Sequence, residues 1–331
     1  MDVIFAKILL KKGRKIITRR DLINDGYDCE IFVNEIRFSE SMRLKKKNYV
    51  VYIFKQKYDN LKEIFSGCSL LTTINLSNYN TDNINDMSNM FSNCSSLLSV
   101  NLSKFNTSNV TNMSNMFHNC NKLESIKLSS FNTNNVTDMN HMFSGCSSLE
   151  SIDLSNFNTN QVINMCGIFF NCSSLESINI SNFNTNNVTS MNCMFSNCSS
   201  LESIDLSNFN TDNITDMSCM FYNCSSLNSI NLSNFNTSNV INMYGMFFNC
   251  SSLEYLDLSN FNTSKVTNMS HMFSLCSSLS EIDLSNFNCD NIKVTKDMVE
   301  MFKGCDDLDI EDVKYQDFKI RNQLIIDMRL I

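Results

Sequence analysis

The stretch MFSNCSSLESIDLSNFNT, residues 194–211, recurs with small changes along most of this chain of 331 residues. The recurrence has a fixed period. Nine cysteines follow one another every 26 residues, and a tenth follows after 29 (Cys68, Cys94, Cys120, Cys146, Cys172, Cys198, Cys224, Cys250, Cys276 and Cys305). One short unit cannot bury its apolar side chains alone, whereas stacked units share a continuous core. The sequence therefore predicts a solenoid.

Two patterns alternate within each unit. In SIDLS, residues 151–155, Ile152 and Leu154 alternate with polar residues, which predicts a short half-buried strand. Further along the unit, apolar residues return at helical spacing (Val266, Met269, Met272, Phe273 and Cys276). Each unit therefore predicts one strand and one short helix, in an α/β solenoid.

The residue before each repeated cysteine is Gly or Asn, with Leu275 as the one exception. Gly and Asn tolerate positive φ, so this column predicts a left-handed end to the helix, with the cysteine folded back into the core. One cysteine per coil does not supply four converging zinc ligands. Stacked parallel side chains also do not easily adopt a disulfide dihedral. We therefore expect buried free thiols, no metal and no cofactor.

The repeat also resembles a known family. FSGCSSLESIDL (143–154) and FYNCSSLNSINL (221–232) resemble the leucine-rich repeats of BspA-like proteins. LSKFNTSNVTNMSNMF (102–117) is similar to the DUF285 repeat. The resemblance implies a leucine-rich-repeat solenoid of 26-residue strand-helix coils, and for some members a surface adhesin or antigen. Ordinary leucine-rich repeats place Asn or Cys after the strand. This chain has Phe there, so we expect an aromatic ladder in place of the hydrogen-bonded one.

We expect three segments, because an uncapped stack would expose apolar side chains and strand edges. Residues 1–60 form a basic N-terminal flank, with 14 Lys/Arg against 8 Asp/Glu, and a β-rich cap with strands in 29–37 and 49–54. Residues 61–305 form nine to ten coils. Residues 306–331 form a C-terminal cap of a strand and an amphipathic helix. The basic runs Lys11–Lys15 and Arg43–Lys47 are interpreted as a solvated flank, with a membrane or nucleic-acid contact as the alternative.

The sequence offers little for catalysis. Of the three histidines, His141 and His271 share a column but lie five coils apart, too far to act together, and His118 stands apart from that column. We therefore expect no enzyme, and interpret the chain as a protein-protein interaction module or scaffold that binds through its strand (concave) face. A surface adhesin is the first alternative, and an uncharacterised enzyme is the less favoured one.

Two sets of residues are candidates for function. The strand face is mostly Ser and Asn, but near the C-terminal end it changes to an acidic patch with one aromatic, suited to a basic or amphipathic partner protein. The candidate binding residues are Ser203, Asp205, Tyr255, Asp257, Glu281 and Asp283. A merely solvated Ser/Asn face is the alternative. Cys193 and Cys219 share a column outside the apolar stripe, and we expect them to be an exposed thiol pair open to oxidation.

The sequence also gives expectations about location. The apolar run VIFAKILL (3–10) is short and contains Lys7, so it does not have the form of a signal peptide. No run approaches the roughly 20 apolar residues of a membrane helix. The net charge of -8 argues against a nucleic-acid partner. We expect a cytoplasmic monomer, with the cell surface, reached by another route, as the alternative.

Overall fold

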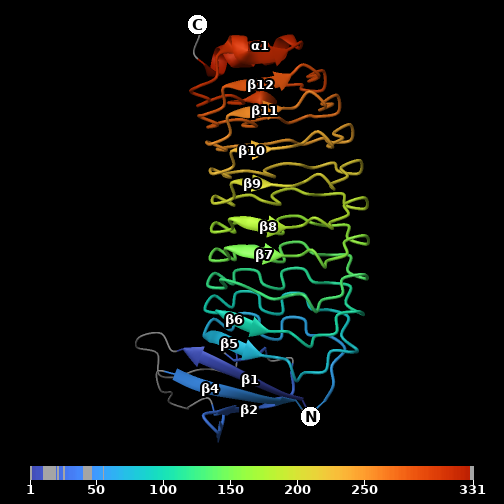
Figure 1. Ribbon diagram of the computed structural model, residues 1–331, viewed down its shortest axis with the longest axis vertical. Helices are drawn as coiled ribbons and strands as arrows, with labels where there is room; N and C mark the ends of the chain where they lie inside the picture. The colour runs from blue at the N-terminus through green and yellow to red at the C-terminus, as the bar shows by residue number, and fades with distance from the viewer. Residues whose placement is uncertain are drawn as a thin grey trace.

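The structure, a computed structural model, describes residues 2–9, 20, 22–24, 27–39, 47–54 and 56–328. It is an elongated stack of coils with the N-terminal strands at one end and helix α1 (Phe318–Asp327) at the other (Figure 1). Short parallel strands line one side of the stack, and paired strands match residues one repeat apart, such as Ile152 and Ile178. The coil strands are β5 (Leu71–Asn75), β6 (Ser99–Asn101), β7 (Ser151–Asp153), β8 (Ser177–Asn179), β9 (Ser203–Ile204), β10 (Ser229–Ile230), β11 (Tyr255–Asp257) and β12 (Glu281–Leu284).

An antiparallel sheet covers the first coil. Strands β1 (Asp2–Leu9), β2 (Cys29–Val33), β3 (Ile36–Arg37) and β4 (Lys47–Phe54) join the coil strands in one sheet of order β3-β2-β4-β1-β5-β6. Strand β1 is antiparallel to both β4 and β5, so it ends the parallel stack. The strands within 29–37 and 49–54 were expected. Strand β1 was missed, although Ile4, Ala6 and Ile8 are buried and alternate with more exposed residues.

The basic runs fall largely outside this description. Lys11–Lys15 lies outside the described residues, and of Arg43–Lys47 only the backbone of Lys47, at the start of β4, is described. Their interpretation as a solvated flank stays a prediction.

The predicted helix of each coil is absent, and this prediction was wrong. Within the described ranges α1 is the one α-helix. The segment Met217–Cys224 and its equivalents in the other coils, here called the turn face, form successive tight turns. The amides of Met220, Tyr222 and Cys224 donate to carbonyls three residues back, whereas an α-helix requires the fourth residue back. The alternate amides donate to carbonyl groups of the next coil. The amide of Cys219, for example, donates to the carbonyl of Tyr244 at 2.8 Å.

The coil spacing explains why a helix does not form. Phenylalanine rings of neighbouring coils stack on the turn face with centroids 5.5 to 5.9 Å apart. A helix with its side chains is about 10 Å wide. Helices in successive coils would therefore clash, whereas the thinner chain of successive tight turns can stack at the strand spacing of about 4.8 Å.

The core residues were predicted correctly. Val266, Met269, Met272, Phe273 and Cys276 are all fully buried, as are their counterparts in most coils. The residue before each repeated cysteine does have positive φ, including Leu275 at 61°, but it ends a turn and not a helix.

Each repeated cysteine is a packing residue. From Cys94 onward the Sγ–H group donates to the carbonyl oxygen of a Phe in the preceding coil, at 3.0 to 3.3 Å. Burial raises the pKa of these thiols, to about 12 for Cys172 and Cys224. They therefore remain protonated at neutral pH.

A buried threonine ladder runs through the coils, and the sequence analysis missed it. The Oγ1 of Thr159 donates to the carbonyl oxygen of Asn184 at 2.8 Å and accepts from its amide at 2.7 Å. The expected phenylalanine column is present as well, with Phe131 and Phe157 stacked at 6.3 Å. The aromatic ladder therefore accompanies a hydrogen-bonded one and does not replace it. The threonine ladder consists of Thr81, Thr107, Thr133, Thr159, Thr185, Thr211, Thr237 and Thr263.

The C-terminal cap closes the last coil. The three inserted residues before Cys305 are taken up at a 3₁₀ helix, Thr295–Met298. Strand β13 (Val313–Tyr315) pairs parallel with β12. Helix α1 follows and buries Ile320 and Leu324. Its N-cap, Asp317, accepts from the Lys319 amide through Oδ1 and from the Cys289 amide through Oδ2. Because Cys289 stands in the threonine column, Asp317 ties the cap to the end of that ladder.

The two caps contact the turn face with opposite chemistry. At the N-terminal end, the hydroxyl of Tyr27 donates to the Lys62 carbonyl at 2.6 Å, and the amide of Asn24 donates to the Ile64 carbonyl at 2.8 Å. At the C-terminal end, the amide of Phe302 donates to Oδ2 of Asp327 at 2.9 Å. To the backbone groups of the turn face, the N-terminal cap thus supplies donors and the C-terminal cap supplies an acceptor.

Candidate binding surfaces

The strand face, meaning the exposed side chains of β5 to β12, contains the predicted binding residues. Ser203 and Asp205 are exposed at β9, two coils before β11. The register of β11 and β12 places Tyr255 opposite Glu281, and Asp257 opposite Asp283. The structure therefore brings together the four residues of the predicted patch and leaves Ser203 and Asp205 apart from them.

The Asp and Asn residues of the strand face share one structural role. Oδ1 of Asp257 accepts from the Ser259 amide at 2.9 Å, and Oδ1 of Asn231 accepts from the Ser233 amide at 3.0 Å. Hydrogen bonds from Ser259 also hold the pKa of Asp257 below its usual value. Both residue types end the strand in a tight turn. The coil that has Lys127 at this position, with no acceptor to offer, forms no strand.

Tyr255 and Asp257 line a groove on this face. The groove has a volume of about 280 Å³ and is shared with residues of the preceding coil, among them Asn231 and Leu232. The Tyr255 side chain is 50 % exposed. An exposed aromatic ring beside a charged carboxylate can cover an apolar part of a partner while binding a cationic group.

Lys314 modifies the acidic patch, and the sequence analysis did not foresee it. Strand β13 places Lys314 beside Asp283. Its Nζ lies 2.9 Å from Oε1 of Glu281 and 3.9 Å from Oδ2 of Asp283. These ion pairs raise the pKa of Lys314 and offset part of the negative charge. Asp257 lies one strand further from Lys314, so it is the carboxylate of the patch with the least compensation.

A second groove lies at the other end of the strand face and was also missed. It measures about 380 Å³ and is lined by Phe5, Lys7 and Tyr49 together with residues of β5 and β6. Phe5 and Tyr49 are 53 % and 64 % exposed. The Nζ of Lys7 lies 5.9 Å from the centre of the Tyr49 ring. The strand face therefore has an aromatic and basic end as well as an aromatic and acidic end.

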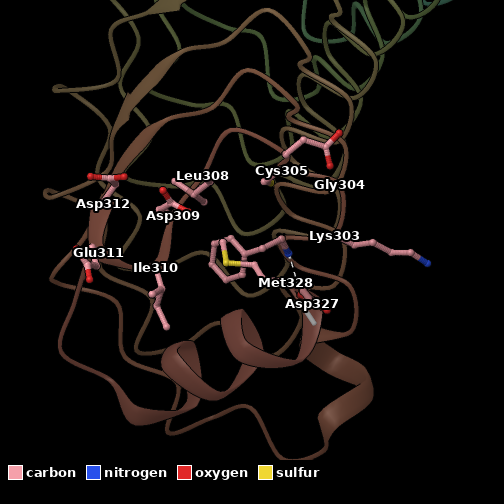
Figure 2. Close-up of a pocket in the computed structure, with 12 residues that line it drawn as sticks. Lys303, Gly304, Cys305, Leu308, Asp309, Ile310, Glu311, Asp312, Asp327 and Met328 are labelled. Carbon is pink, nitrogen blue, oxygen red and sulfur yellow. Dashed lines mark hydrogen bonds between the residues drawn. The ribbon is translucent and has the colours of Figure 1, made fainter. Parts of the chain in front are cut away.

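An acidic cleft of about 790 Å³ separates the last coil from α1. Figure 2 shows Asp309 at the start of a 3₁₀ helix (Ile310–Asp312) before β13, Glu311 and Asp312 within that helix, and Asp327 at the end of α1. Burial raises the pKa of Asp327, although Phe302 and Gln323 donate hydrogen bonds to it. Its carboxylate therefore already has a structural role in joining the cap to the last coil.

Two histidines meet on the turn face. The rings of His118 and His141 lie 6.3 Å apart in an edge-to-face arrangement, and Nε2 of His141 lies 3.8 Å from Sγ of Cys166. The sequence did not point to this contact, because His118 and His141 stand in different columns of the 26-residue repeat. Burial lowers the pKa of both His118 and His141 and raises the pKa of Cys166 to about 11. The histidines are thus neutral and the thiol protonated at neutral pH, which is not the ion pair of an activated cysteine.

Cys193 and Cys219 occupy the same position in neighbouring coils. Both are half-buried, and the Cys193 amide donates to the carbonyl of Ser218, the residue before Cys219. A hydrogen bond between the two thiols lowers the pKa of Cys219 and raises the pKa of Cys193. The two thiols are therefore neighbours, although they are less exposed than we expected.

Two kinds of feature are absent from the described residues. In that part of the chain, no group of three or more His, Cys, Asp or Glu side chains is arranged to hold a metal ion. Likewise, none of the helices in the described ranges is long and apolar enough to cross a membrane.

Comparison with known proteins identifies the repeat. A family model described as "Mycoplasma protein of unknown function, DUF285" matches residues 59–152, 147–231 and 226–325. No curated protein sequence matches the chain. Among solved structures, the crystal structure of a TLR13-ssRNA13 complex matches with 21 % identity and a TM-score of 0.27. The match covers 70 % of this chain and 35 % of that chain, and its RNA ligand carries nothing over to this chain. The three family matches together span most of the repeats, and the chain belongs to the DUF285 family.

Proposed function

We propose that this solenoid is a non-enzymatic protein-interaction module or scaffold that binds a basic segment of a partner protein through its strand face. The binding site is centred on Tyr255 and Asp257. It extends toward Glu281 and Asp283, while Ser203 and Asp205 lie further along the same face.

One observation carries this proposal. The turn after the strand uses a hydrogen-bond acceptor at the Asp257 position, and Asn231 supplies the same bond without charge in the preceding coil. The negative charge of Asp257 is thus not required by the turn. The half-exposed ring of Tyr255 beside it is not required by the core either. Tyrosine is enriched among the residues that contribute most to protein interfaces.

The test uses a substitution that removes charge and keeps the turn. In quantitative pull-downs from the source cells, Asp257→Asn should reduce capture of a specific partner about tenfold, and Tyr255→Ala should reduce it at least as much. Asp153→Asn is the matched control. Asp153 is exposed on the same face and makes the same turn bond, to the Ser155 amide, but it has no aromatic neighbour in its strand β7.

The variants distinguish specific from general binding. Equal losses for Asp257→Asn and Asp153→Asn would indicate only nonspecific attraction to an acidic surface. Unchanged capture by both Asp257→Asn and Tyr255→Ala would refute the assignment.

We also propose that this module works inside the cell, with the surface adhesin as the alternative. Fractionation of source cells, followed by protease treatment of intact cells, separates the two. Digestion of the chain on intact cells would favour the adhesin.

A further inference from the structure

Two cysteines on the turn face differ from the cysteines of the core. Twelve of the 15 cysteines are buried, and the repeated ones are held by a bond to a Phe carbonyl. Cys193 and Cys219 are only half-buried, and they occupy the same turn position in neighbouring coils, where the Cys193 amide donates to the carbonyl of Ser218. These two sulfurs are therefore adjacent to each other and are not engaged with the core.

The neighbouring coils have glycine in this column, and rings from other side chains fill the room beside each glycine. The same turn position is Gly167 in the coil before Cys193 and Gly245 in the coil after Cys219. The ring of His141 lies over Gly167 and the ring of Tyr222 over Gly245, at positions where a Cβ would collide with or crowd them. No side chain of the column itself therefore borders the two cysteines on either side.

We propose that Cys193 and Cys219 form a reversible thiol-disulfide exchange site for low-molecular-weight disulfides such as glutathione disulfide. The thiolate of one cysteine attacks the small disulfide, which forms a mixed disulfide and releases one small thiolate. The second cysteine, as its thiolate, attacks the protein sulfur of that mixed disulfide and releases the second small thiolate. In total, two protein thiols are oxidised to one disulfide, and one small disulfide is reduced to two thiols.

The spacing of the coils permits the product, and because these two side chains are only half-buried they can leave the parallel stacking that disfavours a disulfide dihedral in the core. A disulfide needs Cα atoms about 4.4 to 6.8 Å apart, and neighbouring coils are about 4.8 Å apart. The two residues also have nearly equal φ angles of 56° and 55°, so their turns are alike.

This site is independent of the proposed binding function. The pair lies on the turn face, in a different segment of the coil from the strands that carry Tyr255 and Asp257. Oxidation of the pair should therefore leave capture of the partner unchanged.

The experiment treats the folded, reduced full-length chain with glutathione disulfide and follows it by intact mass and peptide mapping. We expect the wild-type chain to lose two hydrogens, with a bond mapped to Cys193 and Cys219, and dithiothreitol to reverse the change. Cys193→Ala and Cys219→Ala should each retain one glutathione adduct on the remaining cysteine of the pair. Cys166→Ala is the matched control, because Cys166 is also half-buried and lies near the pair, and it should behave like the wild type.

The count of reactive thiols also reports folding. An unfolded variant would react at many core cysteines, as the wild type should in denaturant. The proposal is overturned if the folded wild type keeps all of its thiols, if the bond maps elsewhere, or if either folded single variant gains no adduct on its remaining paired cysteine.

Discussion

At the scale of single residues, the buried threonine ladder joins neighbouring coils by hydrogen bonds from side chain to backbone. Each hydroxyl from Thr107 onward bonds both the amide and the carbonyl of one Asn in the next coil, as Thr159 does with Asn184. The Thr159 hydroxyl is itself buried and bonds both backbone groups of the partly buried Asn184. The ladder therefore fixes the register of the coils, while the phenylalanine columns add apolar contact.

This role leads to a stability prediction. Thr159→Val keeps the shape of the side chain but leaves the amide and carbonyl of Asn184 without the hydroxyl. We expect a loss of about 1 to 3 kcal/mol in the free energy of unfolding, measured by urea denaturation.

The control for this change is Thr189→Val. Thr189 is exposed, and its column contains Ile163 and Ile241 in other coils, so a branched apolar residue is already tolerated there. We expect a change within about 0.5 kcal/mol. Similar losses at both positions would mean that the ladder bonds do not matter.

The sequence predicted backbone conformation and burial correctly at positions where the residue type alone determines them. The Gly or Asn column before each cysteine does have positive φ, and the core methionines and cysteines are buried. The threonine ladder was missed because each hydroxyl bonds an Asn 25 residues further along the chain, a contact that exists only once the coils are stacked. The meeting of His118 with His141 was missed because only residues in one column were compared.

At the scale of elements, the turn face shows that apolar spacing does not identify a helix. The pattern M-x-x-M-F-x-x-C places its apolar residues three and four positions apart, and successive three-residue turns do the same. The sequence also contained evidence against a helix. It lies in a second Gly/Asn column, four residues before the Gly or Asn that precedes each repeated cysteine. There Asn89, Asn115, Gly167 and Gly245 also have positive φ, and a second such residue within one turn rules out a continuous helix.

Circular dichroism tests this element directly. We expect the far-ultraviolet spectrum of the purified chain to show little helix above a background of strands and turns, because α1, with 10 residues, is the one α-helix of the described ranges. The physical reason is that every second amide of the turn face donates to a carbonyl of the next coil, so it is not available for a bond within an α-helix. A spectrum dominated by helix would contradict the turn face.

At the scale of the whole molecule, the end caps determine whether the stack is a closed unit. The sequence indicated that both ends differ from the repeats, and it brought Tyr255, Asp257, Glu281 and Asp283 to one place. It did not predict that β13 would place Lys314 beside two of these carboxylates. That contact depends on how the cap docks and not on any repeated pattern.

A substitution in the cap should change the state of the whole chain. Leu324 on α1 is fully buried, and Leu324→Glu should weaken the docking of the helix by about 2 to 3 kcal/mol or more. The exposed last coil should then cause association, which light scattering coupled to size exclusion would detect.

Ile326→Glu is the control on the same helix, because Ile326 is 66 % exposed, and it should leave the chain in its wild-type state. If Leu324→Glu gave the same elution and mass as Ile326→Glu, the cap would not be needed to protect the last coil.

The direction of the hydrogen bonds on the turn face gives the stack an electrical polarity. The alternate amides that bond between coils on this face all point toward the C-terminal end, so their dipoles add along the axis, much as they do in an α-helix. A hydroxyl and an amide meet the carbonyl end, and the Asp327 carboxylate meets the amide end. Each coil presents carbonyl groups toward the N-terminal end and amide groups toward the C-terminal end. Whole coils can therefore be gained or lost without changing what either cap contacts. The length of such a protein is therefore free to vary, but its two ends are not interchangeable.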